Sequence, residues 1–90
     1  STAEVDYLFG YKGKLVPIEV KSGATGTLRS IGVFMDQAPH SMAVRLYAGE
    51  ILISTITTPG GKTVNLLNLP YYLVSQIEKY LEWFETQITK

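Results

Sequence analysis

Two short segments near the start of the chain alternate apolar and polar residues with a period of two, which is typical of half-buried β-strands. The first runs from Val5 to Phe9 and the second from Val16 to Val20. Between them lies Lys12-Gly13, and a glycine in the second position suits a two-residue turn that needs positive φ there. The pattern predicts a β-hairpin over residues 3–21, which we expect at the centre of a sheet.

The two-residue turn also predicts the register of this hairpin. If Tyr11 pairs with Lys14, Asp6 lies directly opposite Glu19. Directly opposed side chains share a face, with Cβ atoms roughly 4.5–5.5 Å apart, so these two carboxylates repel each other. A divalent cation between them would remove the repulsion, because Mg²⁺ binds carboxylate oxygens, waters and substrate phosphate. The register therefore predicts a metal site, and a slip of one residue would destroy it.

Further charges accompany this pair. The same register places Glu4 opposite Lys21, which makes Glu4 a candidate accessory acid. Lys21 follows Glu19 by two residues on the same face, where a lysine could steady an attacking water or a phosphoryl oxygen. The alternative interpretation is an ordinary solvated face whose ion pairs contribute about 0–1 kcal/mol each.

The middle of the chain predicts a helix followed by strands. Apolar residues at helical spacing predict a helix over residues 27–38, which Pro39 ends. Strands are expected in three segments that alternate or are rich in β-branched residues: 41–48, 51–57 and 63–67. A helix between two strands suggests a crossover, which would make the strand after it parallel to the Glu19 strand.

A last helix is expected to begin at Leu69-Pro70, because proline suits the first helical turn. Its apolar positions recur at helical spacing: Leu73, Ile77, Leu81, Phe84 and Ile88. The same spacing places Glu78, Glu82 and Glu85 on its outer side. Together these elements predict a single α/β domain over residues 1–90, with a mixed sheet flanked by helices.

Composition narrows the classes of function. Eight basic and eight acidic residues give a formal net charge of 0, so no global basic field attracts nucleic acid. Cysteine is absent, which excludes disulfides and thiolate metal sites. No apolar run reaches ~18 residues, so no membrane partner is expected. Without a signal-peptide pattern, the expected location is the cytoplasm.

The charged residues of the hairpin also fit a known signature. Asp6, then Glu19 thirteen residues later, then Lys21 after one intervening residue resemble the D…(D/E)-x-K pattern of the PD-(D/E)XK nuclease superfamily. The longer strings Glu-Val-Asp-Tyr and Val-Pro-Ile-Glu-Val-Lys-Ser-Gly resemble the nuclease-like domain at the C-terminus of bacterial and archaeal AAA+-type ATPases. The similarity continues weakly through Leu67–Leu73. It implies a truncated restriction-endonuclease-like fold and a C-terminal fragment of a longer ATPase chain.

The resemblance further implies metal-dependent hydrolysis of DNA phosphodiester bonds. In that activity Asp6 and Glu19 hold Mg²⁺ or Mn²⁺, while Lys21 orients the attacking water or offsets charge in the transition state. Arg29 and Arg45 are candidate phosphate contacts. The alternative is a non-catalytic interaction module that contacts nucleic acid, the ATPase domain of the same chain, or a second copy of itself.

The superfamily fold normally opens with a helix and a strand before the strand that carries the aspartate, and that first helix often carries another acid. Neither precedes Asp6 here, so we expect the ninety-residue chain alone to be inactive or weakly active on DNA. The sheet should also have an uncovered edge or face, and such surfaces recruit another chain. We therefore expect a homodimer or a higher homo-oligomer.

Overall fold

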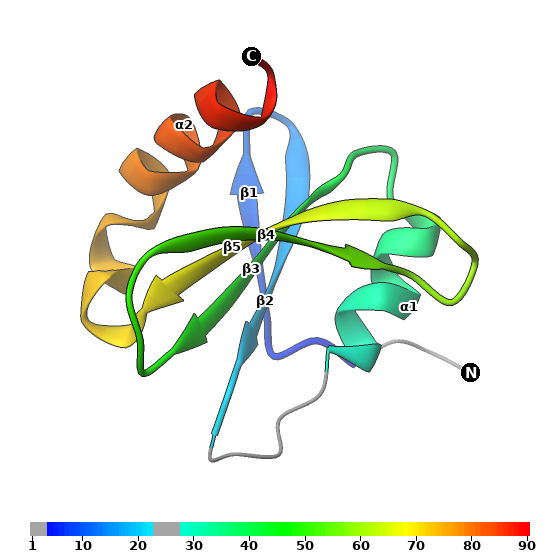
Figure 1. The fold of residues 1–90 in the computed structure, drawn as a ribbon, viewed down its shortest axis with the longest axis horizontal. Coiled ribbons are helices and arrows are strands. Elements are labelled where there is room, and N and C mark those ends of the chain that lie inside the picture. Colours follow the sequence, from blue (N-terminus) through cyan, green and yellow to red (C-terminus); the bar gives the residue numbers. More distant parts are fainter. Residues whose placement is uncertain (1–3, 23–27) are drawn as a thin grey trace.

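The computed structural model describes residues 4–22 and 28–90. Five strands form one sheet: β1 (Tyr7–Tyr11), β2 (Lys14–Val20), β3 (Met42–Tyr47), β4 (Leu52–Thr57) and β5 (Thr63–Pro70). Three helical segments accompany the sheet: α1 (Arg29–Gln37), the 3₁₀-helix η1 (Tyr71–Gln76) and α2 (Ile77–Ile88). The expected α/β class is confirmed, and the mixed sheet with its two flanking α-helices is compatible with a small restriction-endonuclease-like fold (Figure 1).

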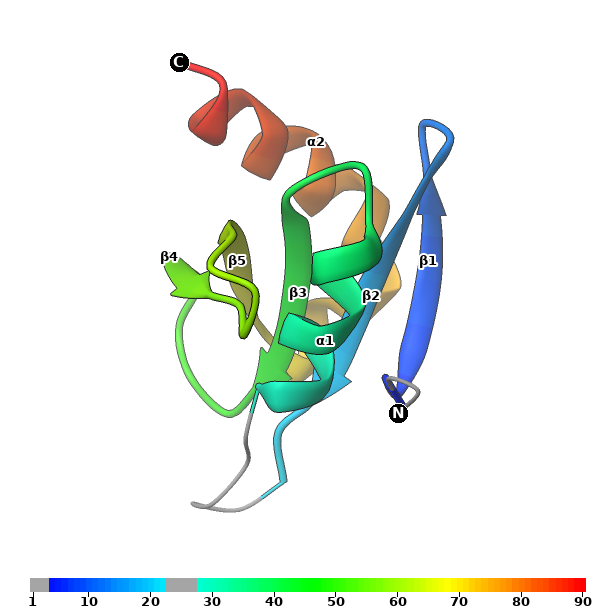
Figure 2. The same cartoon turned by 90° about the vertical axis from the view of Figure 1, so that its right-hand side faces the viewer.

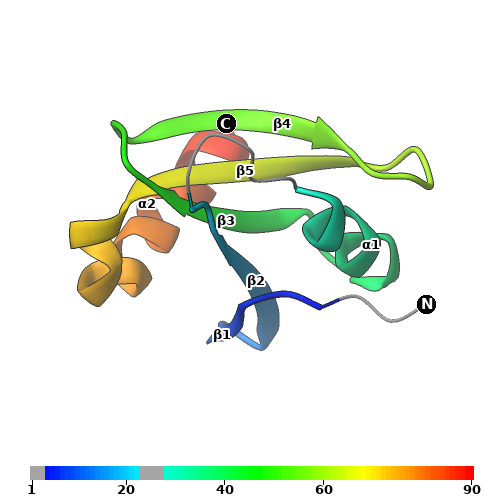
Figure 3. The ribbon, with the colours of Figure 1, turned by 90° about the horizontal axis from the view of Figure 1, so that it is seen from below.

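Strands β1 and β2 form the expected hairpin in the expected register. Their pairing runs from Tyr11–Lys14 beside the turn to Tyr7–Ile18. Both turn residues have positive φ, 48° and 78°, as in the type I′ turn that matches the twist of paired strands. The hairpin is not at the centre of the sheet, however. The strand order is β1-β2-β3-β5-β4, so β1 is an edge strand and β3 lies in the middle (Figure 3).

The central position of β3 follows from the connections between strands. Helix α1 links β2 to β3, and these strands pair in parallel, which confirms the expected crossover (Figure 2). On its other side β3 pairs in parallel with β5, while β4 pairs antiparallel with β5. Strand β2 thus pairs with β3 on one side and with β1 on the other. No other described strand pairs with β1, so β1 lies at the edge of the sheet.

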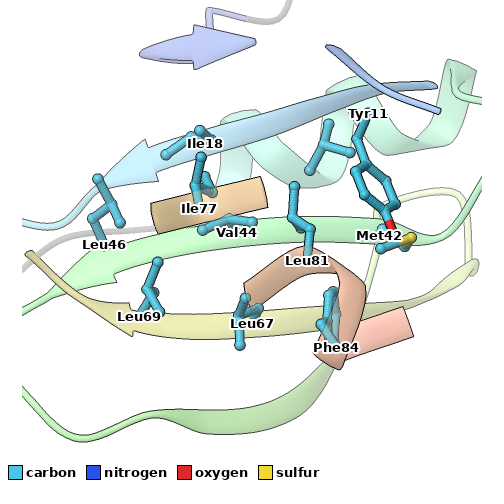
Figure 4. Close-up of a cluster of buried hydrophobic side chains, with 11 residues drawn as sticks. Tyr11, Ile18, Met42, Val44, Leu46, Leu67, Leu69, Ile77, Leu81 and Phe84 are labelled. Carbon is cyan, nitrogen blue, oxygen red and sulfur yellow. The ribbon is translucent and has the colours of Figure 1, made fainter. Parts of the chain in front are cut away.

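The two helices lie on either side of β2 and cover opposite faces of the sheet (Figure 3). Helix α2 packs on the larger cluster of buried residues (Figure 4): Tyr11, Val16, Ile18, Met42, Val44, Leu46, Leu67, Leu69, Ile77, Leu81 and Phe84. Helix α1 packs on the smaller one: Ile31, Met35, Ala43, Val64 and Leu66. Because side chains alternate along a strand, strand residues between members of the larger cluster face α1.

The C-terminal part of the sheet differs from expectation. Strand β5 continues three residues beyond Leu67 to Pro70, and α2 begins only at Ile77 after a 3₁₀ turn. The buried stripe of α2 is nevertheless the expected one, since Ile77, Leu81 and Phe84 are all buried. Proline therefore ends a strand here instead of opening an α-helix.

Two prolines, Pro17 and Pro70, lie within strands. Each lies at a position where the sheet requires no backbone N–H donor, so the absence of an N–H costs no hydrogen bond. The N–H of Lys21 reaches β3 at Leu46 O, so the nitrogen of Pro17, four residues earlier, also faces β3. Pairing of β2 with β3 begins only at Ile18, one residue after this proline. In β5, the nitrogen of Pro70 faces the β4 side, where pairing has already ended.

Both α-helices are short, nine and twelve residues. Over residues 4–22 and 28–90, no helix is long and apolar enough to cross a membrane. The C-terminal end of α1 is fixed by Lys62, whose ammonium group donates to Met35 O, Ala38 O and His40 O at 3.0, 2.8 and 2.6 Å. A cation there also suits the negative end of the helix dipole. Residue 27, where this helix was expected to begin, lies outside the described residues.

Candidate functional site

The hairpin register brings Asp6 and Glu19 together at the open end of the hairpin, away from the turn. The pair that flanks a two-residue turn is hydrogen-bonded, and hydrogen-bonded pairs alternate with pairs whose side chains lie closer. By this alternation Tyr7–Ile18 is hydrogen-bonded, and the next position, Asp6–Glu19, is of the closer kind. The ladder itself stops at Tyr7 and the chain bends at Asp6.

Asp6 has a structural role at this bend. The N–H of Val20 faces β1, whose backbone no longer pairs at this level. Asp6 Oδ2 accepts this N–H at 2.8 Å, which fixes its carboxylate beside the end of β2. Asp6 is otherwise exposed, and its Oδ1 makes no hydrogen bond within the described part of the chain. One oxygen of Asp6 is therefore used by the fold, and its carboxylate also lies close enough to Glu19 to raise the pKa of that residue.

The surroundings of Glu19 differ from those of the exposed Asp6, because part of the Glu19 carboxylate is buried. It alternates with Ile18 and Val20, which pack in the α2 cluster, so its side chain lies on the α1 face. Its Oε2 atom is buried and has no hydrogen-bond partner among the residues that the structure describes. Burial raises the pKa of Glu19, and the charge of Asp6 raises it further. Such a buried oxygen is costly unless a proton or a cation satisfies it.

Lys21 and Glu4 are less firmly tied to this pair. Lys21 follows β2, its N–H donates to Leu46 O at 2.9 Å and its carbonyl accepts from the Tyr71 hydroxyl. Alternation continued past Val20 places its half-buried side chain on the Glu19 face. Glu4 is exposed and lies beyond the paired residues. In residues 4–22 and 28–90 neither residue forms an ion pair, because both ion pairs found there involve Glu85.

A row of polar residues continues from Glu19 across the α1 face of the sheet. Arg45 is the register partner of Glu19 on β3, and Asn68 is the partner of Arg45 on β5. Arg45 Nε donates to Asn68 Oδ1 at 3.2 Å. Sequence analysis missed Asn68, although an asparagine between leucines is an informative signal, because the strand was expected to end at Leu67.

Arg29 lies elsewhere. It is exposed at the start of α1 and lines a shallow groove with Gly32, Ile56 and Pro59. Ile56 belongs to β4, which is the sheet edge opposite β1. Of the two candidate phosphate contacts, Arg45 is therefore the one that the fold brings beside Glu19.

The donor set determines what the site can hold. Asp6 and Glu19 offer only carboxylate oxygens, which suit hard cations such as Mg²⁺ and Mn²⁺. The buried Glu19 oxygen, which lacks a partner in the part of the chain that the structure describes, fits such an ion, since a cation would satisfy it. Within the described residues, no three acidic, histidine or cysteine side chains cluster closely enough to enclose a metal ion. The pair therefore fits an ion whose other ligands are waters or substrate oxygens.

Comparison with known proteins gives no match: neither a family model, nor a curated protein, nor a solved structure is significantly similar to this chain. The function must therefore be argued from the residues and their geometry.

Proposed function

We propose that this domain hydrolyses DNA phosphodiester bonds with the help of Mg²⁺ or Mn²⁺ held by Asp6 and Glu19. One observation carries the proposal: the fold sets a buried carboxylate oxygen, without a hydrogen-bond partner in residues 4–22 and 28–90, beside a second carboxylate. Burial and a like charge both disfavour the ionised Glu19, so an ionised Glu19 at this position costs the fold stability. Perturbed carboxyl groups of this kind are concentrated at functional sites.

Each residue then has a defined task. Asp6 uses one oxygen to accept the Val20 N–H and thereby keeps its second oxygen beside Glu19. Glu19 is held by the internal strand β2, which pairs with β1 on one side and with β3 on the other. Lys21, on the same face, offsets negative charge that develops on the phosphoryl group. The bound ion would act as a Lewis acid toward phosphate and would lower the pKa of water.

The parent chain and the cellular location that we propose follow from the sequence resemblance. We place the domain at the C-terminus of a longer ATPase chain in the cytoplasm, a reducing compartment that suits a chain without cysteine. We expect the ninety-residue chain alone to be weakly active or inactive, because two carboxylates hold Mg²⁺ loosely and zero net charge gives no general attraction to DNA.

A plasmid-nicking assay with Mg²⁺ or Mn²⁺ tests the proposal on this chain and on the longer parent chain. We expect nicking by the parent chain that is lost in Glu19→Gln and Lys21→Ala. Glu82→Gln is the matched control, since Glu82 is an exposed acid on α2. Nicking that survives Glu19→Gln would contradict the Asp6–Glu19 site, and the absence of nicking from every chain tested would contradict a nuclease.

The second candidate function is the interaction module, and the β1 edge of the sheet favours it. Tyr7, Leu8 and Leu15 are 63%, 48% and 56% exposed, which is high for apolar side chains on neighbouring strands. An edge strand with exposed apolar residues is a template for another chain. Light scattering of the wild type and Leu8→Lys tests the self-associating form of this module: it predicts an oligomer that the substitution dissociates, and a monomer at high concentration excludes self-association.

A further inference from the structure

Arg45 combines a fixed position with hydrogen-bond donors that have no partner in the described part of the chain. It is half-buried on the middle strand β3, and its guanidinium lies 5.6 Å from the centre of the Tyr47 ring on the same face. Its Nε donates to Asn68. Among the described residues the two terminal nitrogens make neither a hydrogen bond nor an ion pair, not even with Glu19 on the neighbouring strand. The guanidinium is thus held through Nε, and its terminal nitrogens have no partner within residues 4–22 and 28–90.

Asn68 is the residue that fixes this orientation. It is 2% exposed, and its amide nitrogen donates to Leu52 O at 3.0 Å and to Ser54 Oγ at 2.9 Å. Because both amide protons are used toward β4, the amide oxygen must face Arg45. A buried asparagine whose amide nitrogen and oxygen both have hydrogen-bond partners is held rigidly. Asn68 is thus bonded to β4 on one side and to Arg45 Nε on the other, which holds the arginine on β3 in place.

We propose that Arg45, positioned by Asn68, is an oxyanion subsite that binds a backbone phosphate of DNA beside the Asp6–Glu19 pair. This inference rests on the proposed function, since it names the group that receives the substrate phosphate. A planar guanidinium with unused nitrogens matches a phosphate with two parallel hydrogen bonds. Carboxylates alone would repel a phosphate, and the register places Arg45 on the strand next to Glu19. Asn68 is then a positioning residue.

The direct test is the NMR signal of the arginine Nε–Hε groups. The chain has two arginines, Arg29 and Arg45, so each signal controls for the other. Inorganic phosphate is titrated at constant ionic strength without divalent cations. We expect the Arg45 signal to shift and saturate while the signal of the exposed Arg29 barely moves. A shift of Arg29 alone, or no shift of Arg45, would overturn the inference.

Affinity for a short DNA duplex gives the second measurement. Arg45→Gln and Asn68→Leu should each weaken binding about tenfold, because each removes or misplaces a charge-assisted contact. Arg29→Gln is the matched control and should bind like the wild type. Asn68→Leu also removes hydrogen bonds to β4, so Arg45→Lys provides an independent variant with the charge kept and the planar fork lost. Equal affinity of the wild type, Arg45→Gln and Arg45→Lys would refute the subsite.

These outcomes separate the subsite from the nuclease proposal. A parent chain that nicks DNA equally well, with an unchanged KM, in Arg45→Gln would refute the subsite and keep the nuclease. An Arg45 signal that responds to phosphate supports the subsite even if no chain nicks DNA, because phosphate binding is measured without metal. Loss of the Arg45 response in Asn68→Leu, in a protein whose backbone spectrum stays folded, supports the positioning role.

Discussion

The two ends of the β1–β2 hairpin surround a carboxylate in opposite ways. At the turn, Glu85 of α2 accepts hydrogen bonds from Tyr11, Lys12 and Lys14 at 2.9, 3.1 and 3.2 Å. Hydrogen bonds from Lys12, Tyr11 and Lys14 lower the pKa of Glu85 to about 2. At the open end, Glu19 has a buried oxygen with no described partner, beside another acid, and its pKa is raised.

The two ends of the hairpin therefore differ in role: the turn end stabilises the fold, and the open end is the proposed binding site. The turn end is satisfied: three donors converge on one acceptor and join the hairpin to the C-terminal helix. At the open end Asp6 also serves the fold by accepting the Val20 N–H, but Glu19 is held beside this like charge. Strain of this kind is often retained where it serves binding or catalysis. We therefore expect neutralisation of the two glutamates, Glu85 and Glu19, to shift stability at neutral pH in opposite directions.

The largest effect is expected at Tyr11. Its ring is 2% exposed and packs in the α2 cluster, so Tyr11→Ala should lower the free energy of unfolding by about 3–5 kcal/mol. Tyr7→Ala is the matched control at the other end of β1, where the ring is 63% exposed and the loss should stay within about 0.5 kcal/mol. Urea unfolding measures both, and similar losses would show that the turn end is not the anchored one.

Glu85→Gln should destabilise the domain in a pH-dependent way. The folded-state pKa of Glu85 is lowered to about 2, so its stabilising contribution is fully present above the ordinary value of 4.5. That contribution is lost as the pH falls through about 2. Thermal melts should show a constant deficit of the variant between pH 7 and 5 that closes toward pH 2. A deficit that does not depend on pH would mean that packing, not charge, holds the helix to the hairpin.

Glu19→Gln should have a smaller effect of the opposite sign. The folded-state pKa of Glu19 is raised, so the folded protein binds its proton more tightly than the unfolded chain. The stability of the wild type then falls as the pH rises from the ordinary value of 4.5 through the raised value, and the variant avoids this loss. Melts should show the variant more stable at pH 7 and equal to the wild type below pH 4. A less stable variant at pH 7 would contradict the like-charge interpretation.

The contrast also shows what could be predicted from the sequence. The Lys12-Gly13 turn fixed the hairpin register, because a two-residue loop leaves no freedom in pairing. That register was sufficient to predict that Asp6 and Glu19 meet. The crossover helix was also predictable from local sequence. Its apolar residues recur at helical spacing, and the segment lies between two strands in the sequence.

Other features depended on contacts between distant parts of the chain. Glu85 was expected on the outer side of its helix, yet it reaches the hairpin turn more than seventy residues away in the sequence. Pro70 was expected to open a helix, but pairing with β3 extends β5 to include it. The Arg45–Asn68 contact required knowing that β3 and β5 are neighbours. Periodicity describes one element at a time and does not contain these pairings.

Calorimetric titration with Mn²⁺ tests the central claim, that Asp6 and Glu19 form a cation site, most directly. We expect saturable binding by the wild type that is lost in both Asp6→Asn and Glu19→Gln. Asp36→Asn is the matched control, because Asp36 also accepts a backbone N–H, from Gly60 at 2.9 Å, and should leave Mn²⁺ binding unchanged. No binding by the wild type, or equal binding by wild type, Asp6→Asn and Glu19→Gln, would contradict it.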